Sequence, residues 1–220
     1  ADVYLNGEHI GSHNNAFVEV EWDVAGNLHA GENRLWVRID QGLREAQTHE
    51  LERMDMMWNN DQPWRSWMRK PQYVYSWDWT IWLASLGIWR DVVLTGYDQA
   101  AIADVYARPD GEPLTDGKPA HVTVSVEIAN PTGCAVSLHC AIADRDGCIV
   151  AETDRPVSDA ADLQLTIPEA RLWWCNGMGD AHLYTVTVAV EDAAGHMLDT
   201  CTQRLGLRTI ALTEPALAHG

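Results

Sequence analysis

Arg69-Lys70-Pro71-Gln72-Tyr73-Val74-Tyr75-Ser76-Trp77-Asp78-Trp79 is the centre of a stretch that runs from Trp58 to Arg90 and closes on Gly87-Ile88-Trp89-Arg90. Seven of the eleven tryptophans of the chain fall within this stretch. The core of a small β domain needs fewer tryptophans than this. An indole offers a flat, rigid, apolar face with one N–H at its edge. Such a face suits a sugar ring, which is apolar on its C–H faces and polar at its rim.

Asp78 stands between two of these indoles, Trp77 and Trp79. A carboxylate held there can accept hydrogen bonds from sugar hydroxyls, and charge-assisted bonds are the stronger kind. The alternative is that the tryptophans form the core of a β domain and that Asp78 caps a turn. Composition alone leaves both interpretations open.

Size and charge narrow the class of protein. A chain of 220 residues is long enough for one large or two ordinary domains, and 46% hydrophobic residues can supply their cores. The formal net charge is −17 and the pI is near 4.7. This acidity argues against nucleic acid and against anionic membrane as partners. A neutral partner such as a sugar is compatible with it.

The cysteines are five in number, and their spacing fits no zinc pattern. We therefore expect buried, reduced thiols in a cytoplasmic protein, with no metal and no cofactor. The chain has no apolar run long enough to cross a membrane and no visible signal peptide. The cysteines are Cys134, Cys140, Cys148, Cys175 and Cys201.

The first hundred residues read as short strands and turns. Asn6-Gly7 after Val3-Tyr4-Leu5 is a strong hairpin signal. Gln41 to Met57 is polar and is compatible with one short helix, and Trp58 to Trp67 reads as an ordered loop. Further strands are expected at 17–22, 35–39, 72–76 and 88–97. This pattern is typical of a sandwich or jelly roll.

Beyond Ala100 the composition shifts to Ala, Val, Thr and Asp. We expect strands at 122–128, 136–142, 148–150, 163–167 and 184–190, and a last strand through Leu205-Gly206-Leu207. Turns are expected at 144–147 and 193–195. Seven or so short strands over this length are the pattern of an immunoglobulin-like sandwich.

No catalytic signature is readable from the residues, since there is no H-E-x-x-H, no G-x-S-x-G and no P-loop. A second aromatic cluster lies at Leu172-Trp173-Trp174-Cys175-Asn176-Gly177-Met178-Gly179. Its turn residues place it at one end of the sandwich. The simplest interpretation is a tryptophan pair that fills a seam between domains.

The order of motifs resembles the non-catalytic N-terminal part of family 2 glycoside hydrolases, and among them the β-mannosidases. The matching motifs are Val3–Gly7 with V-Y-L-N-G, Gly31–Leu35 with G-E-N-x-L, Arg69–Trp79 with R-K-A-Q-Y-x-F-G-W-D-W, Gly87–Arg90 with G-I-W-R, Leu172–Gly179 with L-W-W-P-N-G-Y-G and Arg204–Thr209 with R-x-G-F-R-x. The departures are Ser76 for glycine, Thr80-Ile81 for Gly-Pro, Cys175 for proline and Met178 for tyrosine. They bear on the sugar preference more than on the family.

The resemblance implies substrate-binding residues but no catalytic residue in this chain. In the family the two catalytic glutamates lie on a (β/α)8 barrel of about 250 residues, and nothing here alternates β and α. In β-mannosidases the W-D-W loop reaches from the jelly roll into the barrel pocket. Asp78 would then contact the sugar in the −1 subsite, with Trp77 as a pocket wall and Trp79 beside it or in the core.

We therefore expect an all-β chain made of a partial jelly-roll (galactose-binding-like) domain and an immunoglobulin-like β-sandwich. The expected ranges are 1–98 for the sugar-binding jelly roll, without its N-terminal part, 99–212 for the sandwich, and 213–220 for a linker toward a catalytic barrel. The expected partners are a β-mannoside oligosaccharide and that barrel. The chain alone should be inactive in the retaining hydrolysis of terminal β-D-mannosyl residues. The alternatives are an exo-β-glucosaminidase, an endo-β-mannosidase or a free-standing carbohydrate-binding module.

Overall fold

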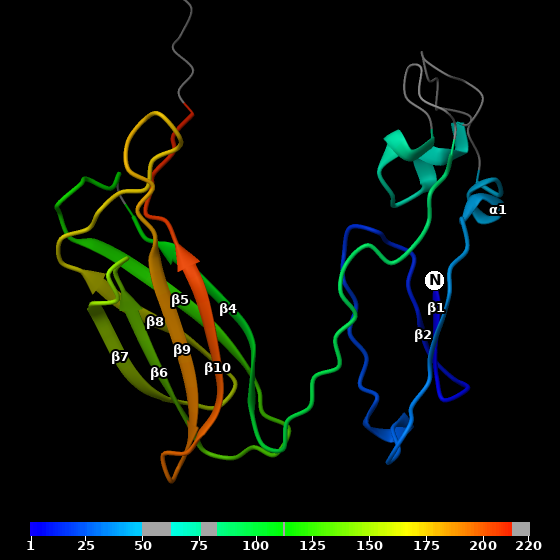
Figure 1. Ribbon diagram of the computed structural model, residues 1–220, viewed down its shortest axis with the longest axis horizontal. Coiled ribbons are helices and arrows are strands. Elements are labelled where there is room, and N and C mark those ends of the chain that lie inside the picture. The colour runs from blue at the N-terminus through cyan, green and yellow to red at the C-terminus, as the bar shows by residue number, and fades with distance from the viewer. Residues whose placement is uncertain (50–62, 76–82, 112, 213–220) are drawn as a thin grey trace, which may run out of the picture. The chain divides into compact units, whose positions relative to one another are not determined.

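The computed structural model describes residues 1–49, 63–75, 83–111 and 113–212. The chain divides into two compact units, residues 1–93 and 94–220. Within the described ranges the strands far outnumber the short helices (Figure 1). The predicted all-β class is therefore confirmed. No helix in these ranges is long and apolar enough to cross a membrane.

The first unit is built on a three-stranded antiparallel sheet in the order β2-β1-β3. Its strands are β1 (Asp2–Leu5), β2 (Glu8–Ser12) and β3 (Leu35–Arg38). The predicted Asn6-Gly7 hairpin is confirmed, with φ of 54° at Asn6 and 90° at Gly7. Positive φ at both central residues is the requirement of the tight turn that matches strand twist. This geometry explains why the sequence places Asn and Gly there.

The side chain of Asn6 joins this hairpin to the turn that precedes β3. Its Nδ2 donates to the Asn27 carbonyl at 2.8 Å and to Asn33 Oδ1 at 2.7 Å, while its Oδ1 accepts from the Arg34 backbone N–H at 2.8 Å. The two motifs V-Y-L-N-G and G-E-N-x-L are thus one hydrogen-bonded assembly. The sequence shows them only as separate stretches.

Four short helical segments complete the described part of the first unit. They are η1 (Ala25–Asn27), α1 (Leu43–Ala46), η2 (Pro63–Trp67) and η3 (Gln72–Tyr75). The strand predicted at 72–76 is wrong for the residues that the structure describes, because Pro71 fixes its own φ and the Val74 N–H donates back to the Pro71 carbonyl at 3.3 Å. The short helix predicted between Gln41 and Met57 is confirmed as α1. The second half of this range, from residue 50 onward, lies outside the described residues.

Two further predicted strands, at 17–22 and 88–97, are not strands in the structure. Both have the alternating sequence pattern of strands. Neither has a neighbouring strand within the described ranges, and a strand requires the ladder of a neighbour to satisfy its N–H and C=O groups. Apolar side chains such as Phe17 and Val93 are consequently exposed.

The second unit is a two-layered antiparallel sandwich (Figure 1). One sheet has the order β4-β5-β8 and the other the order β10-β9-β6-β7. The strands are β4 (Ala101–Pro109), β5 (Ala120–Ala129), β6 (Val136–Ala143), β7 (Ile149–Val157), β8 (Ala160–Ile167), β9 (Tyr184–Asp192) and β10 (Met197–Leu205). This arrangement confirms the predicted immunoglobulin-like sandwich.

The core of the sandwich follows the period of two that the sequence shows. Along β6, buried residues alternate with half-buried ones from Val136 to Ala143. The inward side chains of β5, β6, β8 and β9 meet between the sheets. The turns predicted at 144–147 and 193–195 are confirmed, with φ of 84° at Gly147 and 81° at Gly195. The last strand ends at Leu205, two residues earlier than expected.

The five cysteines are free thiols, but only Cys140 is buried. Burial raises the pKa of its thiol to about 11. Cys148 is exposed, so the prediction that all of these thiols are buried is wrong. It lies at the turn before β7, where side chains face solvent.

Candidate functional site

The predicted substrate-binding residues Asp78, Trp77 and Trp79 lie outside the described residues. The structure describes the chain on both sides of them, Arg69–Tyr75 and Leu83–Arg90. We call these two flanking segments the base of the W-D-W run. The contacts of this base are the described part of the candidate site.

The first residue of this base, Arg69, is hydrogen-bonded to a segment near the start of the first unit. The Arg69 carbonyl accepts a hydrogen bond from the Ala16 N–H at 2.8 Å, and Arg69 forms an isolated parallel bridge with Asn15. Gln72 Nε2 donates to the Arg65 carbonyl at 3.0 Å, which ties η3 to η2. Two backbone contacts and one side-chain contact thus hold the R-K-P-Q-Y motif in place.

Tyr75 is the buried anchor of the segment. Its side chain has no exposed surface, and its ring packs edge-on against Trp64 with the centroids 6.4 Å apart. Burial raises the pKa of its hydroxyl, so this group stays a neutral phenol. Among the described residues the Tyr75 hydroxyl has no hydrogen-bond partner. Tyr75 is thus the fixed, described residue that lies nearest in the sequence to the W-D-W run on its N-terminal side.

Lys70 links the two flanking segments of the base. Its Nζ donates to the Ser85 carbonyl and lies 5.9 Å from the centroid of the Tyr75 ring. Burial lowers the pKa of this ammonium group. The Lys70–Ser85 bond brings together the two ends of the stretch that contains Asp78.

The tryptophans of the stretch take different roles where they are described. Trp64 is half-buried against Tyr75, and Trp67 stacks on His49 with ring centroids 4.6 Å apart. Trp89 is exposed, donates from Nε1 to the Ala16 carbonyl at 3.3 Å and carries the Arg90 guanidinium 4.5 Å from its ring. The described indoles thus line the surface of the base more than they fill a core.

A hollow of about 360 Å³ lies in the same unit, lined by residues around α1 and by Leu86. Leu86 directly follows Ser85, which Lys70 holds. Asp40, Gln41 and Arg44 give the hollow a polar rim. The part of the chain that the structure describes has no group of three His, Cys, Asp or Glu side chains that could hold a metal ion.

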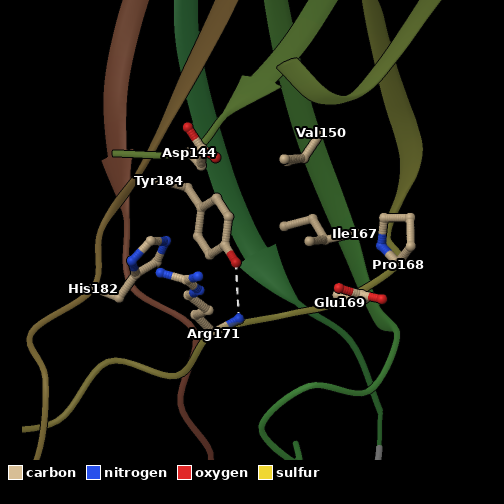
Figure 2. Close-up of a pocket in the computed structure, with 8 residues that line it drawn as sticks. All are labelled: Asp144, Val150, Ile167, Pro168, Glu169, Arg171, His182 and Tyr184. Atoms are coloured by element: carbon tan, nitrogen blue, oxygen red, sulfur yellow. Dashed lines mark hydrogen bonds between the residues drawn. The ribbon is translucent and has the colours of Figure 1, made fainter. Parts of the chain in front are cut away.

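The second unit has a pocket of about 330 Å³ at one end of the sandwich, which sequence reasoning missed (Figure 2). Its lining includes Tyr184, Arg171 and His182. The Tyr184 hydroxyl accepts a hydrogen bond from the Arg171 backbone N–H at 2.8 Å. A tyrosine at the start of this strand that bonds back to the preceding connection is a structural corner of immunoglobulin-like folds. Part of this pocket thus has a structural explanation.

His182 is the residue of this pocket that structure alone reveals. It is 1% exposed, and neither ring nitrogen has a hydrogen-bond partner among the described residues. Its ring meets the ring of Tyr184 edge-on at 4.7 Å. Burial is the first cause that lowers the pKa of this imidazole, and the cations Arg145 and Arg171 lower it further. In the sequence it is one scattered histidine among nine.

Comparison with known proteins agrees with this architecture. Residues 1–90 match the family described as "Glycosyl hydrolase 2 galactose-binding domain-like", and residues 100–208 match "Glycosyl hydrolases family 2". The chain therefore belongs to family 2 of the glycoside hydrolases. It carries the galactose-binding-like domain of this family and the immunoglobulin-like domain.

Within the family, the chain is similar to β-mannosidases. It is 31% identical to β-mannosidase B of Aspergillus oryzae over 235 positions, which span all of this chain and 26% of that protein. The crystal structure of β-D-mannosidase from Dictyoglomus thermophilum superposes with a TM-score of 0.79 at 30% identity, covering 96% of this chain and 26% of that one. A β-glycosidase from Bacteroides vulgatus shares the fold, with a TM-score of 0.63 at 18% identity over 94% of this chain and 22% of that one. The chain thus spans about a quarter of the length of these relatives.

Proposed function

We propose that this chain is the non-catalytic N-terminal portion of a β-mannosidase-like exo-glycosidase that removes terminal β-D-mannosyl residues with retention of configuration. The observation that carries the proposal is its similarity to β-mannosidases over its whole length, at 30–31% identity. The catalytic carboxyl pair belongs to a barrel domain of the same protein. Retention requires these two carboxyl groups to lie about 5–5.5 Å apart.

In this proposal the chain contributes a loop that positions the substrate. Asp78 accepts hydrogen bonds from hydroxyls of the sugar in the −1 subsite, and Trp77 and Trp79 supply apolar faces beside it. The tie between Lys70 and Ser85 supports this role, because it holds the base of the loop. Holding the ring in place for attack lowers the barrier only if the contacts are stronger in the transition state than in the ground state.

The test compares two proteins. One is the 220-residue chain, and the other is the protein expressed from its gene through to the natural stop codon. We expect the longer protein to release 4-nitrophenol from 4-nitrophenyl β-D-mannoside, with the β-anomer of mannose formed first in the NMR spectrum. The 220-residue chain should release none.

Three results would contradict the proposal. One is hydrolysis by the 220-residue chain itself. Another is a longer protein that prefers a β-glucosaminide to the β-mannoside, which would favour an exo-β-glucosaminidase. The third is tight binding of mannose by the 220-residue chain in isothermal titration, which would favour a free-standing carbohydrate-binding module.

A further inference from the structure

One end of the second unit gathers the connection between β8 and β9 and the segment that follows β10 (Figure 1). The Trp173 N–H donates to the Leu207 carbonyl at 2.9 Å, so the two segments are bonded there. The Trp174 N–H donates to the Asp180 carbonyl at 2.9 Å, which closes the turn between them. Gly179 allows this turn, because a Cβ in its place would lie 2.6 Å from the Trp174 ring. Hydrogen bonds and close packing thus fix the conformation of the Trp173–Gly179 turn.

Arg208 lies against both indoles of this turn. Its guanidinium carbon is 5.7 Å from the Trp173 ring and 5.5 Å from the Trp174 ring. Its Nη1 donates to Cys175 Sγ at 3.5 Å. No carboxylate pairs with Arg208 in the described ranges. A guanidinium has five N–H donors in one plane, and stacking on an aromatic ring uses a face of the group and leaves these donors free. Most of its donors therefore remain available to an acceptor that approaches from outside the unit.

Exposed apolar side chains occur in the Trp173–Gly179 turn and in the segment that follows Arg208. Met178 is 64% exposed, and beyond β10 Ile210 and Leu212 are 79% and 90% exposed. At the same end, His182 is buried and lines the pocket in Figure 2, and its two ring nitrogens have no hydrogen-bond partner among the described residues. Buried polar atoms normally have partners, and large exposed apolar side chains at one end of a domain are typical of a docking surface.

We propose that the Trp173–Gly179 turn, together with Arg208, is the surface on which the catalytic domain of the same protein docks, with Arg208 donating to a carboxylate or backbone carbonyl of that domain. This inference rests on the proposed function. The described chain leaves the unit from this end, since β10 ends at Leu205 and Ile210 and Leu212 follow. The relatives are about four times as long as the chain. A domain joined here by a short connection has a high effective concentration at this surface.

The experiment is hydrogen exchange by mass spectrometry on the 220-residue chain and on the protein expressed to its natural stop codon. We expect the amides of Cys175, Asn176 and Gly177 to exchange at least about tenfold more slowly in the longer protein, because docking removes them from water. The Asp192–His196 turn at the opposite end of the sandwich is the internal reference and should exchange equally in both.

Two variants of the longer protein sharpen the test. Arg208→Ala should return the turn to fast exchange, and Arg208→Lys should do the same, because an ammonium group cannot lie flat against two indoles. Arg204→Ala removes an equal charge from an exposed position on β10 and should leave the exchange of the turn unchanged.

Equal exchange of the turn in the two proteins would overturn the docking surface, even if the longer protein hydrolyses β-mannosides. A stop codon directly after Gly220 would overturn it too, since the proposed occupant would not exist. Sedimentation showing that the 220-residue chain dimerises, and that Arg208→Ala abolishes the dimer, would assign the surface to a second copy. Protection of the turn in a longer protein that leaves β-mannosides intact would support docking and reject the proposed activity.

Discussion

Asn33 illustrates how single side chains hold the first unit together. Its Oδ1 accepts from Asn6 Nδ2 at 2.7 Å and from the His29 N–H at 3.1 Å. Its Nδ2 donates to the carbonyls of His29 and Gly31 at 2.8 and 3.2 Å. The side chain thus replaces backbone partners that a loop of this shape lacks.

We expect Asn33→Ala to lower the free energy of unfolding of the first unit by about 1–3 kcal/mol, because several polar groups lose their partners together. Urea denaturation followed by tryptophan fluorescence measures this. The exposed Asn14 is the matched control, and Asn14→Ala should change the value by less than about 0.5 kcal/mol. Equal effects of the two substitutions would mean that the Asn33 bonds do not hold the turn.

His182 makes the second unit sensitive to acid. Its imidazole titrates below its ordinary pKa of 6.5, because burial and the cations Arg145 and Arg171 disfavour its charge more than Asp180 and Asp144 favour it. In the unfolded chain it takes up a proton near 6.5. Below that pH the unfolded state therefore binds more protons, and stability falls as the pH drops.

His182→Phe should remove this loss, since a phenyl ring keeps the contact with Tyr184 and has no proton to take up. The free energy of unfolding of the second unit, measured between pH 7.5 and pH 5, should fall less steeply in the variant than in the wild type. His121→Asn, at an exposed position of the same unit, should follow the wild-type curve. Parallel curves for His182→Phe and the wild type would show that His182 does not control the acid response.

At the scale of elements, the sandwich was predictable from sequence and much of the first unit was not. Apolar residues recur at every second position of β5, β6, β8 and β9. The core that these side chains form lies between two sheets of this chain, so the pattern alone is enough to predict the strands. The segments 17–22 and 88–97 carry a similar pattern without neighbouring strands in the described ranges, and pattern alone cannot supply a neighbour. The alternating residues that follow Pro71 form the helical turn η3 and not the predicted strand.

Contacts between distant residues were the part of the site that could not be predicted. Lys70 and Ser85 are fifteen residues apart and carry no shared signal. The W-D-W run itself was found through its tryptophan content and its resemblance to a family. Its own geometry lies outside the described residues, so the roles of Asp78, Trp77 and Trp79 stay predictions.

The corner at the start of β9 is the element-scale contact that is simplest to test. Tyr184→Phe removes the acceptor of the Arg171 N–H and leaves the ring in the core. We expect the second unit to lose about 1–3 kcal/mol of unfolding free energy in urea denaturation. Tyr106→Phe is the matched control on an exposed tyrosine of β4 and should have almost no effect. A similar loss in both variants would contradict the corner.

At the scale of the whole molecule, the chain combines a galactose-binding-like domain and an immunoglobulin-like domain of family 2 glycoside hydrolases. Its acidity, with a net charge of −17, suits a neutral substrate better than an anionic one. In the proposed enzyme these domains would support a catalytic barrel and contribute one substrate-positioning loop to its active site. The proposed function then depends on whether Asp78 contacts the substrate.

The most direct measurement is kcat/KM for 4-nitrophenyl β-D-mannoside in the protein expressed to its natural stop codon, with Asp78→Ala beside the wild type. Asp91→Ala, at an exposed position beyond the G-I-W-R motif, is the control and should keep the wild-type value. We predict that Asp78→Ala loses more than about tenfold in kcat/KM, because contacts to the reacting sugar are lost. Wild-type kinetics in Asp78→Ala would remove Asp78 from the site and contradict the account.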